Sequence, residues 1–114
     1  MAKDNIKQFS MTKGDTFAFQ IEILDFDTHE IYTGDLTSAY FSVKKRLDSK
    51  SFTFQKSIGD GITKVNDGYY RVRVAPEDTA DIISGLYVYD LQITIGDDVK
   101  TILKGTLNIE QDVT

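Results

Sequence analysis

The chain of 114 residues is 40% hydrophobic and 27% charged, which predicts one globular domain that folds without metal or disulfide crosslinks. It contains no cysteine, so disulfides, thiolate metal sites and a thiol nucleophile are excluded. The formal net charge of −5 disfavours a nucleic-acid partner. The sequence has neither a run of about 18 apolar residues nor an apolar signal region, which disfavours a membrane partner.

The first half of the chain predicts strands separated by polar turns. Residues 1–5 are polar and are expected to form a flexible N-terminus, after which residues 6–11 indicate a weak first strand. Side chains alternate with a period of two over residues 17–24, which is typical of a strand with one buried face. A polar connection over 25–35 follows, and a second alternating run predicts a strand over 36–46.

The second half continues this rhythm. Short alternating runs bounded by glycine, aspartate or asparagine predict further strands over 52–58, 62–65, 69–74, 87–95 and 103–109. Pro76 suits the first position of a helix, and the acids that follow it suit the positive end of the dipole, so one helical turn is expected near 76–84. Seven or eight strands spaced by about 8–12 residues predict a single all-β sandwich or small barrel over 6–114.

The acids and the single histidine are expected to serve turns. The acids gather at predicted turns, at Asp25 and Asp27, at Asp60, and at Asp97 and Asp98. Turn chemistry is favoured there over calcium, because no calcium-loop spacing is present. His29 lies in a polar loop without the neighbouring residues that a catalytic triad or a metal site requires, so we expect its side chain to be solvated. No glycine-rich phosphate loop occurs, so we predict no catalysis, no metal and no cofactor.

Two groups of basic residues are candidates for an interaction surface. The run Lys44-Lys45-Arg46 stands at the end of a predicted strand, where protection of a sheet edge is favoured over a grip on phosphate. Arg71 and Arg73 share the outward face of another predicted strand, where carboxylates across the strand are expected to pair with them.

The aromatic residues leave one alternative open. Most of the six tyrosines and seven phenylalanines fall on predicted buried faces, which favours packing in the core or at its rim. Tyr32, Tyr40 and Tyr69 are the candidates for exposure, and Tyr40 and Tyr69 are the tyrosines we include among the interaction residues. A carbohydrate-binding module would require two or more exposed rings on one concave surface. A hydrolase with paired acids ranks last, because no acid stands alone in an apolar run.

One segment resembles immunoglobulin domains. Gly85-Leu86-Tyr87-Val88-Tyr89 is similar to their Gly-x-Tyr-x-Cys run, in which the tyrosine hydroxyl bonds to the upstream backbone as a tyrosine corner. Tyr89 stands where the cysteine would be, its partner cysteine is also missing, and the chain has no tryptophan. The resemblance implies an immunoglobulin-like antiparallel sandwich without its disulfide.

An ordered set of segments spans about residues 12–114: Lys13–Phe17, Thr33–Thr37, Lys44-Lys45, Asp67–Val72, Pro76–Ala80, Gly85–Gln92, Gly105–Ile109 and Asp112–Thr114. In the order and spacing of these segments the chain resembles small immunoglobulin-like domains of tailed phages and prophages, found in upper baseplate proteins, tail-fibre bases and head-decoration proteins.

The phage resemblance implies a structural component of a virion, assembled in the bacterial cytoplasm. Its partners would be other virion proteins or further copies of the chain, and it implies no catalytic residues. An adaptor or decoration role is favoured over a fibre if the chain is complete. The first strand, about 5–12, and the last, about 99–109, are expected to offer sheet edges to a partner.

Overall fold

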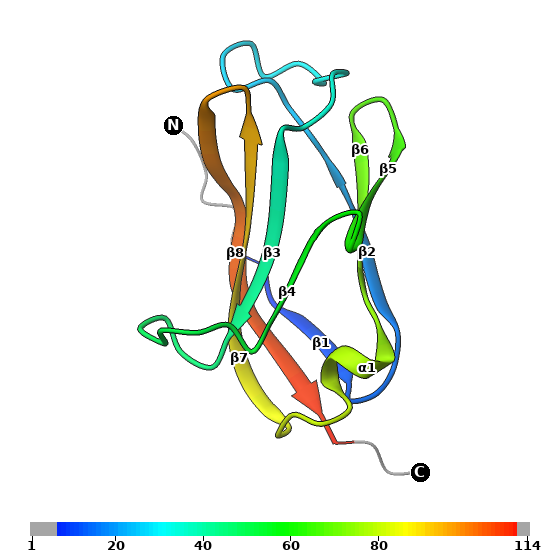
Figure 1. Cartoon of the computed structure of the whole chain (residues 1–114), viewed down its shortest axis with the longest axis vertical. Coiled ribbons are helices and arrows are strands. Elements are labelled where there is room, and N and C mark those ends of the chain that lie inside the picture. Colours follow the sequence, from blue (N-terminus) through cyan, green and yellow to red (C-terminus); the bar gives the residue numbers. More distant parts are fainter. Residues whose placement is uncertain (1–6, 112–114) are drawn as a thin grey trace.

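The computed structural model describes residues 7–111 and shows an almost entirely β domain (Figure 1). Its elements in chain order are β1 (Phe9–Thr12), β2 (Phe17–Glu22), β3 (Ser38–Lys44), β4 (Phe54–Ile58), β5 (Gly61–Asn66), β6 (Tyr69–Val74), α1 (Pro76–Thr79), β7 (Gly85–Ile95) and β8 (Asp98–Glu110). The N-terminus expected over 1–5 lies outside the described residues. Within the described part of the chain, no helix is long and apolar enough to cross a membrane.

The strands form two facing layers that are joined along one side (Figure 1). The sheet order is β1-β8-β7-β3-β4-β5-β6-β2, so β1, β8, β7, β3 and β4 make one layer and β5, β6 and β2 make the other. Two residue pairs between β4 and β5 join the layers, and these pairs are parallel, as is the pairing of β1 with β8. The other neighbouring strands are antiparallel, and the arrangement is an immunoglobulin-like β-sandwich, as expected.

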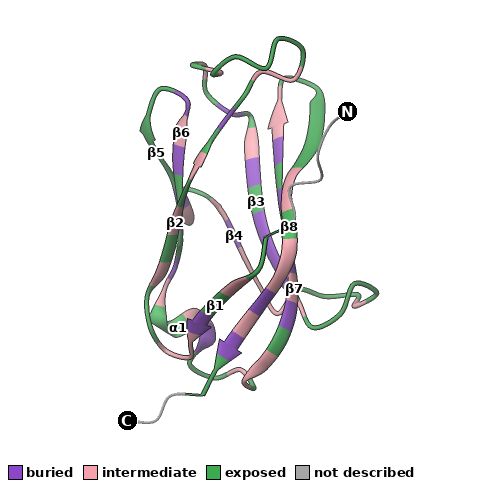
Figure 2. Cartoon of the chain, turned by 180° about the vertical axis from the view of Figure 1, so that it is seen from behind, coloured by how far each residue is buried: buried purple, intermediate pink, exposed green. Residues whose placement is uncertain are grey.

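Buried and more exposed residues alternate along several strands (Figure 2), and the buried side chains form the core between the layers. β3 turns Phe41 and Val43 inward, and β6 turns Val72 and Val74 toward them from the opposite layer, so that all four are fully buried. Burying a side chain of this size stabilises the fold by about 1.5–3 kcal/mol. The period of two seen in the sequence is therefore the period that builds the core.

Phe9 of β1 closes the side of the sandwich where the two layers are not joined by hydrogen bonds. Its ring stacks on Phe19 of β2 with centroids 4.7 Å apart and meets Phe17 edge-on at 5.3 Å. The same ring lies 5.4 Å from that of Tyr89 on β7. Because β1 pairs with β8 and not with β2, these ring contacts connect the two edge strands.

The tyrosine corner expected from the sequence is present. The hydroxyl of Tyr87, two residues into β7, donates a hydrogen bond to the backbone carbonyl of Ile83. The contact ties the start of β7 to the turn before it. Tyr87 is buried, and this burial raises the pKa of its hydroxyl.

Tyr89 stands at the position of the immunoglobulin cysteine and forms a hydrogen bond where that cysteine would form a disulfide. Its hydroxyl donates to the carbonyl of Lys7 at 2.7 Å, and burial raises the pKa of Tyr89 to about 12. The Lys7 amide in turn donates to the Lys104 carbonyl at 2.9 Å. At Gly105 a Cβ atom would overlap the Lys7 carbonyl, so only glycine allows the segment before β1 to approach β8 this closely.

The short helical turn expected near 76–84 is present. α1 is one turn at Pro76–Thr79, and the chain turns over residues 80–84 before β7 begins. Asp78 caps the helix by accepting the Ala75 amide at 2.7 Å. The chain must then reverse within a few residues to place Ile83 beside Tyr87, and a longer helix would prevent this.

Two strand expectations need correction. The last strand is not an edge: β8 lies between β7 and β1, whereas β1 does lie at an edge as expected. The strand expected over 52–58 begins at Phe54, and Phe52 stands outside it with 49% of its surface exposed. Phe52 fits the alternating pattern of the strand as well as Phe54 does. The sequence pattern therefore could not show that Phe52 lies outside the strand.

Candidate interaction surface

The outward face of β3 and β7 carries the first group of candidate residues. Tyr40 and Lys44 point outward from β3, alternating with buried residues, and Tyr40 is 40% exposed. Across the ladder Tyr40 faces Gln92, and Lys44 faces Val88 of β7. The face therefore combines polar residues with apolar ones, which also include the 65% exposed Leu86 at the start of β7.

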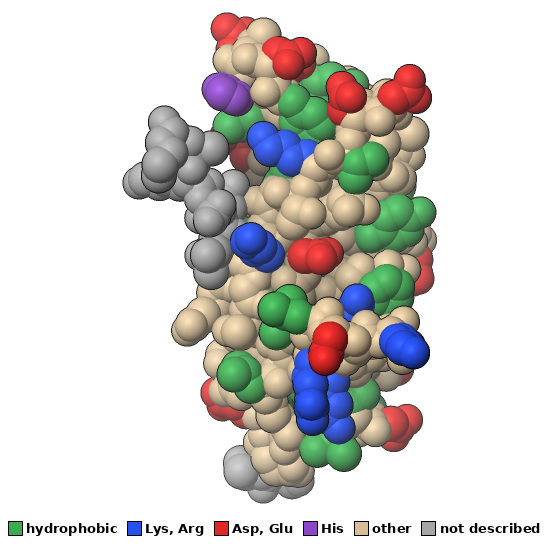
Figure 3. Space-filling view, turned by 90° about the vertical axis from the view of Figure 1, so that its left-hand side faces the viewer, with side chains coloured by type: hydrophobic (Ala, Val, Ile, Leu, Met, Phe, Trp, Pro, Cys, Tyr) green, Lys and Arg blue, Asp and Glu red, His purple; other side chains and the backbone are tan. Residues whose placement is uncertain are grey.

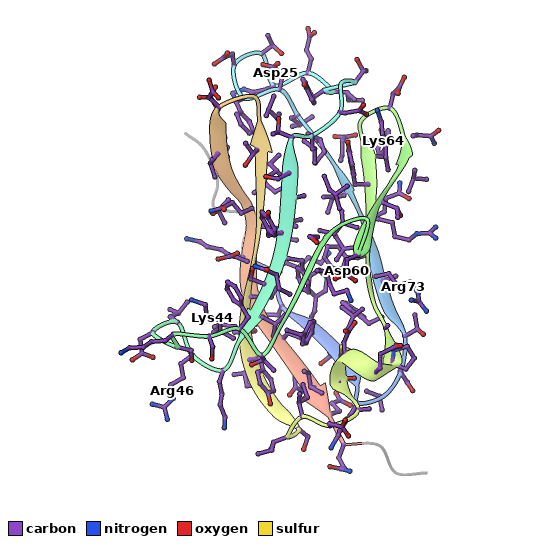
Figure 4. The ribbon with its side chains drawn as sticks, in the orientation of Figure 1. Asp25, Lys44, Arg46, Asp60, Lys64 and Arg73 are labelled. Carbon is purple, nitrogen blue, oxygen red and sulfur yellow. The ribbon has the colours of Figure 1, made fainter. Side chains whose placement is uncertain are left out.

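A loop projects from the end of this face. We call residues 44–53 the basic loop: it carries Lys44, Lys45, Arg46 and Lys50 against the single acid Asp48, a formal charge of +3. Figure 4 shows the loop standing out from the sandwich, with Arg46 directed away from it.

Hydrogen bonds give the basic loop a defined shape. The Arg46 amide donates to Ser49 Oγ at 3.1 Å, and the Ser49 amide donates to the Arg46 carbonyl at 3.1 Å. The Thr53 amide donates to the Val43 carbonyl at 2.7 Å, which closes the base of the loop. The loop is thus a turn that presents its side chains to solvent.

Apolar side chains accompany the cations. Leu47 at the turn is 84% exposed, and the Lys44 ammonium lies 5.4 Å from the ring centre of Phe52. Leu47 also lines a depression of about 250 Å³ on the sheet face, together with Ser42, Lys44, Val88, Asp90 and Lys104. Apolar and basic groups therefore lie together on this side of the domain, interspersed with polar and acidic ones (Figure 3).

Asp90 is the acidic group of this depression. Burial raises the pKa of Asp90 above its usual value, and the positive charge of Lys44 opposes the shift. The hydrolase alternative required two close carboxylates in a deep pocket. The lining of this depression contains one carboxylate, Asp90, so it does not provide that arrangement.

The second group of candidate residues lies on the other layer. Tyr69, Arg71 and Arg73 point outward from β6, facing Glu22, Gln20 and Ala18 of β2. The Tyr69 hydroxyl donates to Glu22 Oε2 at 2.9 Å, and this hydrogen bond raises the pKa of Tyr69.

The expected pairing of the two arginines with carboxylates is wrong. On β2 the residues that face them are Gln20 and Ala18, which carry no charge. Neither Arg71 nor Arg73 forms an ion pair with another described residue. Their outward direction was predictable from alternation, but their cross-strand neighbours depend on register, which alternation does not give.

The candidate residues are thus divided between opposite faces. Tyr40 and Lys44 lie with Lys45 and Arg46 on the β3 side, whereas the β6 residues face away from them (Figure 4). Tyr40 and Tyr69 consequently do not converge on one surface, and Tyr32 is half-buried against the core. The stacking platform that a carbohydrate-binding module needs is not formed by these tyrosines.

The opposite end of the sandwich from the basic loop is acidic. We call the loops at 24–37, 66–68 and 96–98, with Lys64 and Lys100, the acidic end. Hydrogen bonds hold these loops together: the Ile23 amide donates to the Gly68 carbonyl at 2.8 Å, and the Gly96 amide donates to Thr37 Oγ1 at 3.0 Å. The acidic end contains seven carboxylates and two lysines, a formal charge of −5 with His29 neutral.

Asp25 of this end acts as a turn residue, as expected. Asp25 Oδ1 accepts the amides of Asp27 and Thr28 at 2.8 and 3.0 Å, and these bonds lower the pKa of Asp25. His29 is exposed in the same turn, as expected, with a positive φ of 62°. Within residues 7–111, no group of three or more His, Cys, Asp or Glu side chains is placed to hold a metal ion.

Sequence reasoning missed a buried ion pair. Lys56 points inward from β4, its side chain is 9% exposed, and its Nζ lies 3.0 Å from Asp78 Oδ2 of α1 and 3.5 Å from Asp60 Oδ1. Gly61 makes room for it, because a Cβ there would overlap Lys56 Cε. The signal available was a lysine at an inward position of the alternating run from Phe54 to Ile58, where a buried charge requires a partner.

Comparisons with known proteins add evidence on the fold. No family model matches the sequence, and no curated protein matches it significantly. Part of the endo-β-1,4-mannanase of Thermotoga petrophila is similar, with a TM-score of 0.51, 14% identity, and coverage of 95% of this chain but 18% of the mannanase. The extracellular domain of the voltage-gated sodium channel β4 subunit aligns over 99% of this chain and 98% of its own, at 9% identity and a TM-score of 0.44. The chain thus spans less than a fifth of the mannanase, and that likeness concerns the fold alone.

Proposed function

We propose that this chain is a non-catalytic interaction module of a tailed-phage or prophage virion, where it serves as an adaptor or attachment domain. The observation that carries the proposal is the group of exposed apolar and basic side chains on the basic loop and on the outward face of β3 and β7. Leu47 at 84% and Leu86 at 65% exposure lie at its two sides.

Exposed apolar groups that are contiguous and rimmed by charge are typical of surfaces that bind protein. Leu47 and Val88 share one depression, and Leu86 precedes Val88 by two positions on the same face of β7. A protein partner that covers them would remove apolar area from water, and the surrounding lysines would set its orientation.

The phage origin of the module is supported by the order of segments in the sequence, from Lys13–Phe17 to Gly105–Ile109. The location that we propose follows from that origin: the virion, after assembly in the bacterial cytoplasm. The partners would be other virion proteins or further copies of this chain. The carbohydrate-binding alternative gains no support, because Tyr40 and Tyr69 lie on opposite layers.

Induction of the prophage in a strain that encodes the chain tests this function. Particles are separated on a density gradient, and peptides of the chain are quantified by mass spectrometry against those of the major capsid protein. We expect a constant ratio of the two across the particle peak. Recovery of the chain only from the unsedimented lysate, with particles present, would contradict a virion role.

Variants supplied in trans locate the surface. Leu47→Asp combined with Leu86→Asp is expected to remove the chain from particles, because both side chains lie on the proposed contact. Thr63→Asp, an exposed outward position on β5 of the other layer, is the matched control and should be retained. Circular dichroism establishes that all variants are folded.

A further inference from the structure

Besides Arg71 and Arg73 on the other layer, unpaired charges of opposite sign gather at two separate places, the basic loop and the acidic end. Lys45, Arg46 and Lys50 of the basic loop form no ion pair with another described residue. At the acidic end, Lys64 engages Asp35 at 2.8 Å and Asp67 at 3.5 Å. The remaining acids there that make no ion pair with described residues are Asp25, Asp27, Glu30, Asp97 and Asp98.

These charges do not neutralise one another within one molecule. The domain measures 46 × 28 × 22 Å, and Figure 4 shows Asp25 at the upper end of its long axis and Arg46 projecting sideways from its lower part. Since the Debye length at physiological ionic strength is about 8 Å, the two groups are screened from each other in a single copy. Contact between them requires two molecules.

Apolar side chains accompany the charges at both places. The basic loop exposes Leu47 and Phe52, and the acidic end exposes Ile31 at 45% and Leu24 at 41% beside its carboxylates. A contact between the two would therefore match apolar with apolar as well as positive with negative, which is the composition of a specific protein interface.

We propose that the basic loop of one copy binds the acidic end of a second copy, so that the chain associates head to tail. The proposal deepens the assembly role given above by naming the partner. Because the two contacting surfaces differ, the interface is heterologous, and each bound copy leaves a free loop at one end and a free acidic end at the other. Repetition gives a ring if the rotation closes and a filament if it does not.

Sedimentation velocity of the purified chain tests the proposal. We expect the mass to rise with concentration between about 10 µM and about 1 mM at low salt, and to return to that of a monomer at about 500 mM salt, where the charges are screened. A monomer at every concentration in low salt would overturn the proposal. Binding of anionic vesicles or nucleic acid by such a monomer would assign the basic loop to those partners instead.

Neutral variants test each surface with a matched control. Lys45→Gln with Arg46→Gln should weaken association about tenfold. Arg71→Gln with Arg73→Gln makes the same change of charge on the other layer and should leave association unchanged. Equal weakening by the two pairs would overturn the assignment to the basic loop and indicate an effect of net charge.

The acidic end is tested in the same way. Asp27→Asn with Glu30→Gln is expected to weaken association about tenfold, whereas Asp15→Asn with Glu77→Gln, two exposed acids away from the acidic end, should not. A mixture of the loop variant and the acidic-end variant is decisive. Each retains one working surface, so the mixture should stop at a heterodimer, and continued growth to larger species would overturn the proposal.

The gradient experiment on particles is independent of these measurements. If the chain is found in virions but remains monomeric in solution at low salt, the head-to-tail contact is wrong and the virion role stands. If the chain self-associates but is absent from particles, the virion role is wrong and the contact stands.

Discussion

Two lysines of the domain each pair with two aspartates, with different consequences. Lys56 and Lys64 each lie near two aspartates, with shortest Nζ–O distances of 3.0 and 2.8 Å. The Lys56 side chain is 9% exposed and connects β4 to α1 inside the sandwich. The Lys64 side chain is 30% exposed, and its partners Asp35 and Asp67 are 85% and 77% exposed.

The comparison teaches that burial, and not distance, decides what an ion pair does. At Lys56 the charges are removed from water, so that losing either partner leaves an uncompensated charge in the interior. At Lys64 water and salt already screen both partners, and the pair mainly reduces the local excess of carboxylates. The interior around Lys56 therefore uses charge for stability, whereas the acidic end around Lys64 keeps charge available for a partner.

The largest expected effect separates these two lysines. Lys56→Met should lower the free energy of unfolding by about 3 kcal/mol, because Asp78 stays partly buried without its cation. Lys64→Met should leave it within the error of the experiment, because its partners are solvated. Urea denaturation of both variants measures the difference. Equal losses would show that the degree of burial does not distinguish the pairs.

The next largest effect concerns the hydrogen bond between the uncharged Tyr89 hydroxyl and the Lys7 carbonyl. Tyr89→Phe should destabilise the domain by about 1 kcal/mol, since the Lys7 carbonyl loses the hydroxyl that donates to it. Tyr40→Phe removes a hydroxyl from an exposed side chain and is the matched control. A loss at position 40 as large as that at position 89 would contradict the distinction between interior and surface.

Alkaline titration sharpens the comparison through the same tyrosine. The pKa of Tyr89 is raised to about 12 in the folded domain, above about 10 in the unfolded chain. Its contribution is therefore complete below pH 10 and is lost as the pH rises toward 12, because the unfolded state releases the proton first. We expect stability to fall over this interval by less in Tyr89→Phe than in the wild type. Identical pH profiles would contradict the shift.

The smallest effect lies on the outward face of the sheet. Lys44→Met should raise the pKa of Asp90 further, since the Lys44 charge opposes the shift caused by burial. Arg71→Gln, on the other layer, should not change it. Carbon-detected NMR titration of the Asp90 carboxyl measures both. If the pKa of Asp90 is unchanged in Lys44→Met, the Lys44 charge does not act on Asp90, which contradicts the account.

Much of the fold could be predicted from the sequence, because burial on one face of a strand imposes a period of two. The runs at β2, β3, β6 and β7 were placed within a few residues, and the segment from Gly85 to Tyr89 indicated the tyrosine corner. The strand order was not predictable, since pairing depends on contacts distant in sequence. That is why β8 was expected at an edge and is found between two strands.

The candidate surface was predictable only in part. The run from Lys44 to Arg46 was identified by its charge, but Leu47 and Phe52 look like core residues until their exposure is known. Tyr40 and Tyr69 lie on opposite faces because β3 and β6 belong to different layers, which the sequence pattern does not show. The acidic end is assembled from three separate loops, and their proximity follows from hydrogen bonds such as that from Gly96 to Thr37, which no local pattern reveals.

A charge-swap experiment tests most directly the claim that the two ends complement each other. One chain carries Lys45→Glu and Arg46→Glu, and the other carries Asp27→Lys and Glu30→Lys. Each alone should sediment as a monomer at low salt, and their equimolar mixture should regain association, because the reversed loop meets the reversed end and the native loop meets the native end. A mixture that sediments no faster than its components would contradict the claim.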